Sequence, residues 1–244
     1  GSLTAANRSK IYFGESLDKT STETSASILN NNSPLNIGTT HDLDNRPFGG
    51  YIAEVIIYTV TVNDAQRIIV NNYLSSKYNI ALSANDKYAG DTPGNGDFDK
   101  NLAGVGAEAS GSNPTFSATT SLGLGIKTLS GLGTGDYILA GHATATNSVN
   151  ILDIGGISGA NPGRWQRVWY IDVTNAGAVI QADVQFDMVA GGMTGTTPST
   201  ASNYKLLYRS GTSGTWSEKA TASSISGTTI TFSSYNFNNN ADDG

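Results

Sequence analysis

The chain has 244 residues and carries 14 Lys and Arg against 20 Asp and Glu, which gives a formal net charge of −6. Because the sequence contains no basic cluster, we expect no electrostatic binding to nucleic acid or to anionic lipid. The absence of cysteine excludes a disulfide scaffold and a thiolate metal site.

The composition favours β structure. Charged residues make up only 14% of the chain, glycine accounts for 29 residues, and Ser, Thr and Asn are abundant. This balance is typical of many short strands joined by polar turns. The length suits either one large β-domain or two smaller ones. No apolar run approaches the roughly 20 residues of a membrane helix, so we expect no membrane insertion.

The first predicted elements are short. Residues 9–14 predict a strand that ends in a turn, residues 35–38 predict a second short strand, and residues 41–46 form a polar loop. The best-specified stretch follows at residues 49–80. Within it, residues 51–58 are rich in β-branched side chains and apolar on both faces, which predicts a central, well-covered strand.

A helix is predicted directly after this strand, over residues 63–79. Asn63 can cap its first N–H groups, and Gln66 stands three residues on, where a capping box needs its partner. Apolar residues at helical spacing continue as far as Tyr73. Asn79 is suited to the C-terminal cap.

The sequence GYIAEVIIY at residues 50–58, with the short helix behind it, resembles the closing segment of a concanavalin A-like (laminin G-type) domain. The ending at residues 73–80 is similar to that of large bacterial secreted surface proteins, which are adhesin-like and exported by the type IX route. In those proteins, such a domain is joined to a second β-domain of unassigned function.

The resemblance implies a mainly β chain of two antiparallel β-sandwich-type domains with one short helix. Residues 1–82 would be the C-terminal segment of a jelly-roll, concanavalin-like domain, closed by the helix at residues 63–79. Residues 83–244 would be a second, immunoglobulin-like sandwich. Since a concanavalin-like sandwich needs more strands than residues 1–82 provide, we expect the chain to be a fragment of a longer protein.

Short strands recur through the second half, as an antiparallel sandwich requires. They are predicted at residues 102–109, 122–129, 137–140, 150–154, 165–173, 178–188, 204–208 and 228–232. The clearest spans residues 180–188, where apolar and polar residues alternate strictly, which indicates one buried and one solvated face. Arg167 with Trp169, and the segments at 103–106 and 205–207, are similar to the second domain of the resembled proteins.

The best metal-site candidate is a Gly-rich loop with four oxygen ligands: Asp91, Asn95, Asp97 and Asp99. The last three of these copy the first three ligand positions of a calcium loop. The remaining pattern is missing, because Lys100 stands where that loop needs glycine and Gly106 where it needs glutamate. The sequence therefore leaves two alternatives, a calcium site and a solvated linker. Asp42, Asp44 and Asn45 form a second, weaker candidate.

Aromatic and histidine residues offer fewer leads. Trp165, Trp169 and Trp216 belong either to the core or to a sugar-stacking platform. His41 and His142 fall in different predicted domains, and we expect both to be solvated loop residues.

No catalytic constellation is recognisable. No Gly-x-Ser-x-Gly elbow or phosphate-binding loop has the required spacing. Asp183 and Asp187 would lie about 13 Å apart along one strand, beyond the roughly 5 to 10 Å that separates the carboxylates of glycosidases. We expect these two acids to form a solubilising face, and the sequence predicts no catalytic and no cofactor-binding residue.

These observations favour a non-enzymatic structural or adhesive segment of a large extracellular bacterial surface protein, either on the cell surface or secreted. Its expected partners are other surface proteins, glycans or further copies of the chain through self-assembly. The alternative is a calcium-dependent carbohydrate-binding module appended to a secreted enzyme. Calcium is the one cofactor that the sequence suggests.

Overall fold

The computed structural model describes residues 9–21, 35–39, 47–117, 123–143, 147–160, 162–175, 177–193 and 198–238. Over these residues the chain is mainly β, with antiparallel sheets of the β-sandwich type and one α-helix, which confirms the predicted fold class. The chain divides into two compact units, Gly1–Val62 and Asn63–Gly244. The sequence placed the boundary between two domains at residue 82. That division into domains stays a prediction.

The first unit contains a β-hairpin. Strand β1 (Ser9–Phe13) pairs antiparallel with β2 (Ser16–Ser21), and a bulge between Ile11 and Tyr12 shifts the register. Gly14 opens the connecting turn with φ of +58°, a left-handed conformation that glycine adopts without steric cost. This hairpin confirms the short strand and turn predicted at residues 9–14.

The predicted central strand at residues 51–58 is wrong. The segment has no strand conformation, and its apolar side chains are exposed, with Tyr51 at 102% and Ile57 at 65%. A strand forms only where a neighbouring strand completes its backbone hydrogen bonds. None of the described strands pairs with residues 51–58, so the β-branched sequence does not form a strand there.

Helix α1 (Asp64–Tyr78) confirms the predicted helix and both of its caps. The Asn63 side chain accepts a hydrogen bond from the Gln66 N–H, Gln66 reaches back to the Asn63 N–H, and Asn79 ends the helix in the left-handed conformation. The helix start is also tied to a hairpin of the second unit, because Asn63 Nδ2 donates to the Ser112 carbonyl. The helix therefore packs on β3 and β4, whereas the sequence placed it in the first domain.

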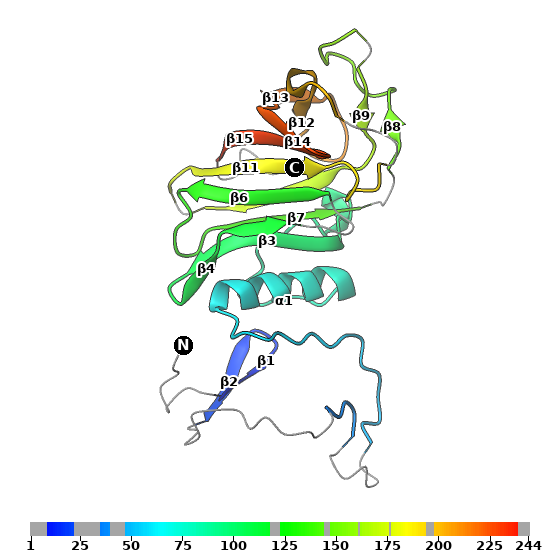
Figure 1. The fold of residues 1–244 in the computed structure, drawn as a ribbon. Helices are drawn as coiled ribbons and strands as arrows, with labels where there is room; N and C mark the ends of the chain where they lie inside the picture. Colours follow the sequence, from blue (N-terminus) through cyan, green and yellow to red (C-terminus); the bar gives the residue numbers. More distant parts are fainter. Residues whose placement is uncertain are drawn as a thin grey trace. The chain divides into compact units, whose positions relative to one another are not determined.

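Two antiparallel sheets follow (Figure 1). The first has the order β10 (Trp169–Thr174), β7 (Tyr137–His142), β3 (Lys100–Glu108) and β4 (Gly111–Asn113). The second has the order β14 (Ser224–Ser226), β15 (Thr229–Phe237), β11 (Ile180–Asp187), β6 (Leu124–Ser130) and β5 (Thr115–Ser117). Helix α1, the first sheet and the second sheet lie as three successive layers.

Each interface between these layers has its own core. Between the sheets, Ile180, Ala182 and Val184 of β11 are each 0% exposed, which confirms the alternation predicted for that strand. Between α1 and the first sheet lies a separate cluster: Ile68, Tyr88, Leu102, Tyr137, Leu139 and Tyr170. Strand β7 is buried along its whole length, because the core between the sheets covers one of its faces and the cluster beneath α1 covers the other.

The edge of the sandwich beside β10 carries two small two-stranded sheets. In one, β8 (Val149–Asn150) pairs with β9 (Arg164–Trp165), and in the other β12 (Lys205–Tyr208) pairs with β13 (Ser217–Thr221). The strand predicted at residues 150–154 is therefore wrong beyond its first residue, where the chain turns instead. The strand predicted at residues 165–173 is broken into β9 and β10.

Candidate functional site

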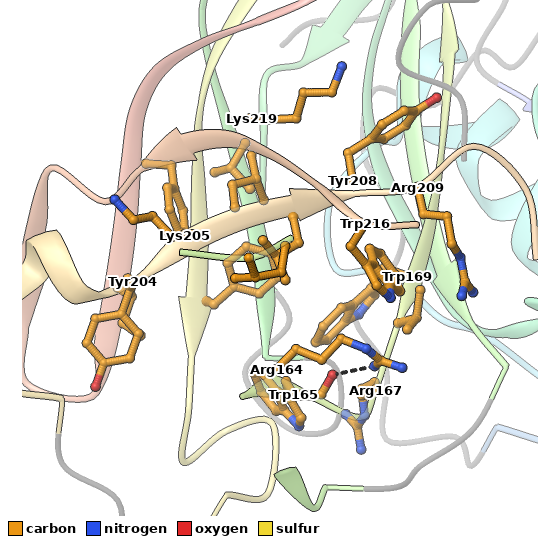
Figure 2. A pocket seen from close by; sticks show the side chains of 18 of the residues that line it. Arg164, Trp165, Arg167, Trp169, Tyr204, Lys205, Tyr208, Arg209, Trp216 and Lys219 are labelled. Atoms are coloured by element: carbon orange, nitrogen blue, oxygen red, sulfur yellow. Dashed lines mark hydrogen bonds between the residues drawn. The ribbon is translucent and has the colours of Figure 1, made fainter. Parts of the chain in front are cut away.

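A cavity of about 870 Å³ opens at this edge of the sandwich (Figure 2). Residues of β9 and β10 line one side, residues of β11 and β15 line the floor, and the β12–β13 hairpin covers it. Sites for small molecules in proteins typically enclose about 300 to 1,000 Å³. The cavity is therefore large enough to hold such a ligand.

The charged residues that line the cavity all have one sign. Five cationic residues line it: Arg164, Arg167, Lys205, Arg209 and Lys219. No Asp, Glu or His of the described residues is part of the lining. In a chain with 20 acidic residues and only 14 basic ones, this grouping of cations gives the cavity a positive potential.

All three tryptophans of the chain line the same cavity. Trp165 and Trp169 meet edge to face with ring centroids 5.2 Å apart, and Trp169 packs against Phe186 at 5.3 Å. The sequence left core packing and ligand contact open for these residues. In the structure Trp165 and Trp169 do both, because they pack against the inter-sheet core and also line the cavity, whereas Trp216 lines the cavity without belonging to that core.

Two of the indole N–H groups lack a partner. The Nε1 atoms of Trp165 and Trp169 are buried, and no hydrogen-bond acceptor among the described residues reaches either. A buried donor without an acceptor is costly, so native proteins nearly always satisfy such groups. Since neither atom has appreciable accessible surface, a molecule in the cavity would reach them only if the indole rings moved.

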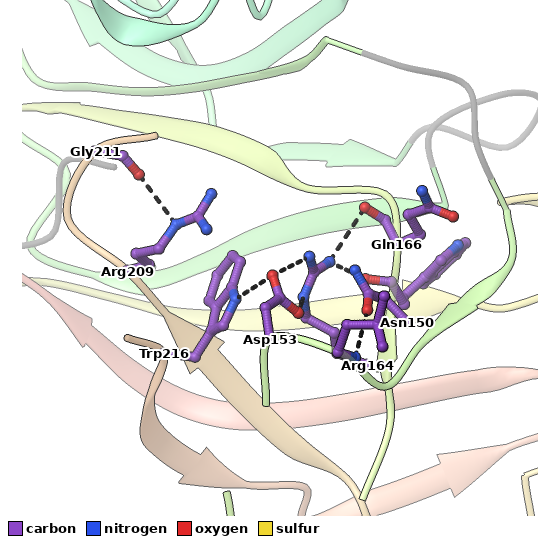
Figure 3. Close-up of polar contacts among 9 residues, drawn as sticks. Asn150, Asp153, Arg164, Gln166, Arg209, Gly211 and Trp216 are labelled. Atoms are coloured by element: carbon purple, nitrogen blue, oxygen red, sulfur yellow. Dashed lines mark hydrogen bonds and ion pairs between the residues drawn. The ribbon is translucent and has the colours of Figure 1, made fainter. Parts of the chain in front are cut away.

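The hairpin is fastened to the loop before β9 through one carboxylate (Figure 3). Arg164 donates from Nε to Asp153 Oδ1 at 2.8 Å and from Nη2 to Oδ2 at 2.6 Å, a bidentate pair. Trp216 Nε1 of the hairpin donates to the same carboxylate at 3.2 Å. The guanidinium groups of Arg164 and Arg209 lie 4.9 and 4.4 Å from the centre of the Trp216 ring, as cation–π contacts.

The surroundings shift the ionisation of these groups. The hydrogen bonds from Arg164 lower the pKa of Asp153, and the bond from Trp216 lowers it further. Burial lowers the pKa of Arg167, while burial and then the neighbouring charge of Arg164 lower that of Arg209. Holding these cations together therefore costs free energy, which an anion in the cavity would offset.

Acid should weaken the attachment of the hairpin. The folded-state pKa of Asp153 lies below its unfolded value, so its contribution is complete above the unfolded pKa and is lost as the pH falls through the folded one. Its side chain is 36% exposed, so after solvent screening we expect a loss of about 1 kcal/mol below about pH 4. Urea unfolding between pH 7 and pH 3 measures this loss.

The variant Asp153→Asn is the control for that measurement. Asp187 also has a lowered pKa, caused first by the Ala190 N–H, so acid destabilises the chain at more than one carboxylate. Asp153→Asn should remove only the Asp153 share of the pH dependence. An identical pH profile in the variant and the unchanged chain would contradict the assigned role.

The predicted calcium loop, Asp91, Asn95, Asp97 and Asp99, surrounds a short 3-10 helix (Pro93–Asn95). Asn95 Nδ2 donates to the Ala89 carbonyl at 2.8 Å, and Lys100 Nζ lies 3.1 Å from an Asp99 oxygen. Burial raises the pKa of Asp91. Among the described residues no three His, Cys, Asp or Glu side chains are grouped so as to hold a metal ion. Calcium binding here stays a prediction, and Asp42, Asp44, Asn45 and His41 lie outside the described residues.

His142 is not the solvated loop residue that the sequence predicted. It ends β7, is 1% exposed, and its Nε2 lies 3.0 Å from Asn101 Nδ2 as a hydrogen-bonded pair. The strand extends two residues further than its apolar pattern, which is why the histidine is buried. Asp183 and Asp187 are half-buried and accept hydrogen bonds from neighbouring backbone groups, in addition to any solubilising role.

Sequence reasoning missed the cationic half of the cavity. A local signal was present, because the run RWQRVW at residues 164–169 concentrates two arginines and two tryptophans in a chain poor in both. Comparison with models of known protein families, with curated proteins and with solved structures finds no match to this chain. Its function must therefore be argued from the cavity itself.

Proposed function

We propose that this chain is a non-enzymatic, adhesive segment of an extracellular bacterial surface protein, and that its second unit binds a ligand in the cavity beside β10. One observation carries the proposal: all three tryptophans and five cations line a single cavity that has no carboxylate among its described lining residues. The low charge, the polar turns and the resemblance to secreted surface proteins support the extracellular location.

The chemistry of the lining supports binding rather than turnover. General acid–base catalysis uses a group that exchanges a proton near neutral pH, usually a histidine or a carboxylate. The described lining instead offers guanidinium, ammonium, indole and hydroxyl groups over apolar side chains. Separately, the described part of the chain has no helix with the length and hydrophobicity needed to cross a bilayer.

Tryptophan fluorescence tests the proposal directly, because every tryptophan of the chain lines the cavity. We expect a saturable change in emission when the chain is titrated with at least one member of a panel of glycans, surface-protein peptides and small organic ions. Excess unlabelled ligand should compete with a labelled one. If no member of the panel changes the emission, the cavity is not a binding site and a purely structural spacer is the better description.

The second candidate is a calcium-dependent carbohydrate-binding module appended to a secreted enzyme. Its support is the edge-to-face pair of Trp165 and Trp169, since indole rings stack on sugar faces, together with the oxygen-rich loop at residues 91–99. This candidate predicts glycan binding that a chelator abolishes and added Ca²⁺ restores. Binding that is indifferent to a chelator would favour the first proposal.

A further inference from the structure

We infer that the cavity takes an organic anion with an apolar body, a carboxylate or sulfate head on an alkyl or aromatic group. The inference rests on the proposed ligand binding in the same cavity. It assigns the chemical class of that ligand, and it differs from the neutral or acidic sugar that a carbohydrate-binding module would take.

The charged and indole groups of the lining are all donors, whereas its two serine and four tyrosine hydroxyls can both donate and accept. Arginine, lysine and indole groups donate hydrogen bonds and accept none. A sugar hydroxyl both donates and accepts, so a sugar site also needs strong acceptors; the described lining has no carboxylate, and Asn203 is its one side-chain amide. A carboxylate or sulfate head only accepts, and it therefore matches the guanidinium and ammonium donors of the lining.

Three of the five cations have no carboxylate partner among the described residues. Arg209 donates from Nε to the Gly211 carbonyl at 3.3 Å. Lys205 Nζ donates to Thr221 Oγ1 at 2.7 Å, and Lys219 Nζ lies 4.5 Å from the centre of the Tyr208 ring. Arg164, by contrast, is neutralised by Asp153. The lining thus keeps a net positive charge, which the longer-range attractions of Arg209 to Asp153 and of Lys205 to Glu218 offset in part and a bound anion would balance further.

The floor of the cavity is apolar and well fixed. It is made by side chains of the second sheet that belong to the inter-sheet core: Val184, Phe186, Ile230 and Phe232. Both methionines of the chain, Met188 and Met193, also line it, and their flexible thioethers adapt to ligands of different shape. In the view of Figure 2, Arg164, Arg167 and Arg209 lie toward one end and Tyr204 toward the other. The head of the ligand would lie among the arginines and its body over this floor.

The test compares ligands that differ in one property at a time. Sodium decanoate has both the head and the body, decyltrimethylammonium has the same body with the opposite charge, acetate has only the head, and glucuronate has the head on a polar body. We expect decanoate, below its micelle concentration, to change the tryptophan emission saturably, with an affinity at least tenfold higher than the other three. Its affinity should fall as the salt concentration rises.

Variants locate the binding within the chain. Arg209→Gln should weaken decanoate binding by about 10- to 100-fold, the effect of losing a charge-assisted hydrogen bond. Because Arg209 also contacts Trp216, the double variant Lys205→Gln and Lys219→Gln provides an independent test that leaves that contact in place, and it should weaken binding in the same direction. Lys127→Gln, at an exposed position of β6 outside the cavity lining, is the matched control and should bind as the unchanged chain does.

Several results would overturn the inference. Equal binding of decyltrimethylammonium, equal or tighter binding of glucuronate, or unchanged decanoate affinity in both cavity variants would each exclude it. A change in emission that accompanies loss of the far-ultraviolet circular dichroism would show unfolding by an amphiphile and would count against the site. If a glycan or peptide binds and decanoate does not, this inference fails while the proposed function stands. If nothing binds, both fail.

Discussion

Replacing Asn72 by alanine should lower the free energy of unfolding by about 3 kcal/mol. Asn72 lies on α1 and is 1% exposed. Its Nδ2 donates to the Ile68 carbonyl at 2.9 Å and to the Asn85 carbonyl at 2.8 Å, and its Oδ1 accepts from the Lys87 N–H at 2.8 Å. One amide thus joins the helix to the segment that follows it, and alanine would deprive buried backbone groups of these bonds.

The neighbouring residue on the same helix is the matched control. Asn71 Nδ2 is buried, and no hydrogen-bond partner among the described residues reaches it. Asn71→Ala should therefore change the stability by no more than about 0.5 kcal/mol, because it removes no hydrogen bond from that amide N–H group. Urea unfolding followed by circular dichroism measures both variants. Equal stabilities for the two would show that the bridge from Asn72 contributes nothing.

Replacing Gly104 by alanine should cost about 3 kcal/mol, through overpacking rather than through a lost contact. A Cβ atom at this position would lie 2.2 Å from Leu139 Cδ2 and 2.6 Å from the Ile138 carbonyl oxygen. The second of these is backbone of the paired strand β7, so it cannot move aside without disturbing the sheet. The glycine is required because the Leu139 side chain lies across β3 in the core beneath α1.

Gly125 in β6 provides the comparison, since it is also a glycine inside a sheet. A Cβ atom there would meet nothing nearer than the Phe116 carbonyl oxygen at 3.5 Å, an ordinary contact. Gly125→Ala should be neutral or stabilising by up to about 1 kcal/mol, because alanine reduces the freedom of the unfolded chain. Thermal unfolding distinguishes the two variants. A Gly104→Ala chain as stable as Gly125→Ala would refute the steric argument.

Local signals account for what the sequence predicted correctly. The helix is specified by residues at its own two ends, Asn63, Gln66 and Asn79, and the structure has both the capping box and the C-terminal cap in place. The alternation in β11 predicts its buried face because side chains on successive strand residues point to opposite sides. In both cases the determining residues are close together in the chain.

The failures concern partners that are distant in the sequence. Residues 51–58 have the composition of a buried strand, yet no described strand pairs with them. His142 is buried because α1 on one side and the second sheet on the other cover β7, which no local pattern reveals. The cavity joins the run at 164–169 to a hairpin some forty residues later, through Asp153 and Trp216. The sequence predicted a strand that carries Trp165 and Trp169 but not the charges that surround them.

The position of Asn63 has a consequence for how the chain tolerates change. This residue is the first of the second unit, and it holds both the capping box and a hydrogen bond to the β3–β4 hairpin. The residue that caps the start of the helix therefore belongs to the sandwich unit itself. Insertions, deletions or a different sequence ahead of Asn63 would leave this cap and its hydrogen bond to the hairpin in place. We therefore expect α1 to begin at the same residue, and the sandwich to keep its fold, after such changes.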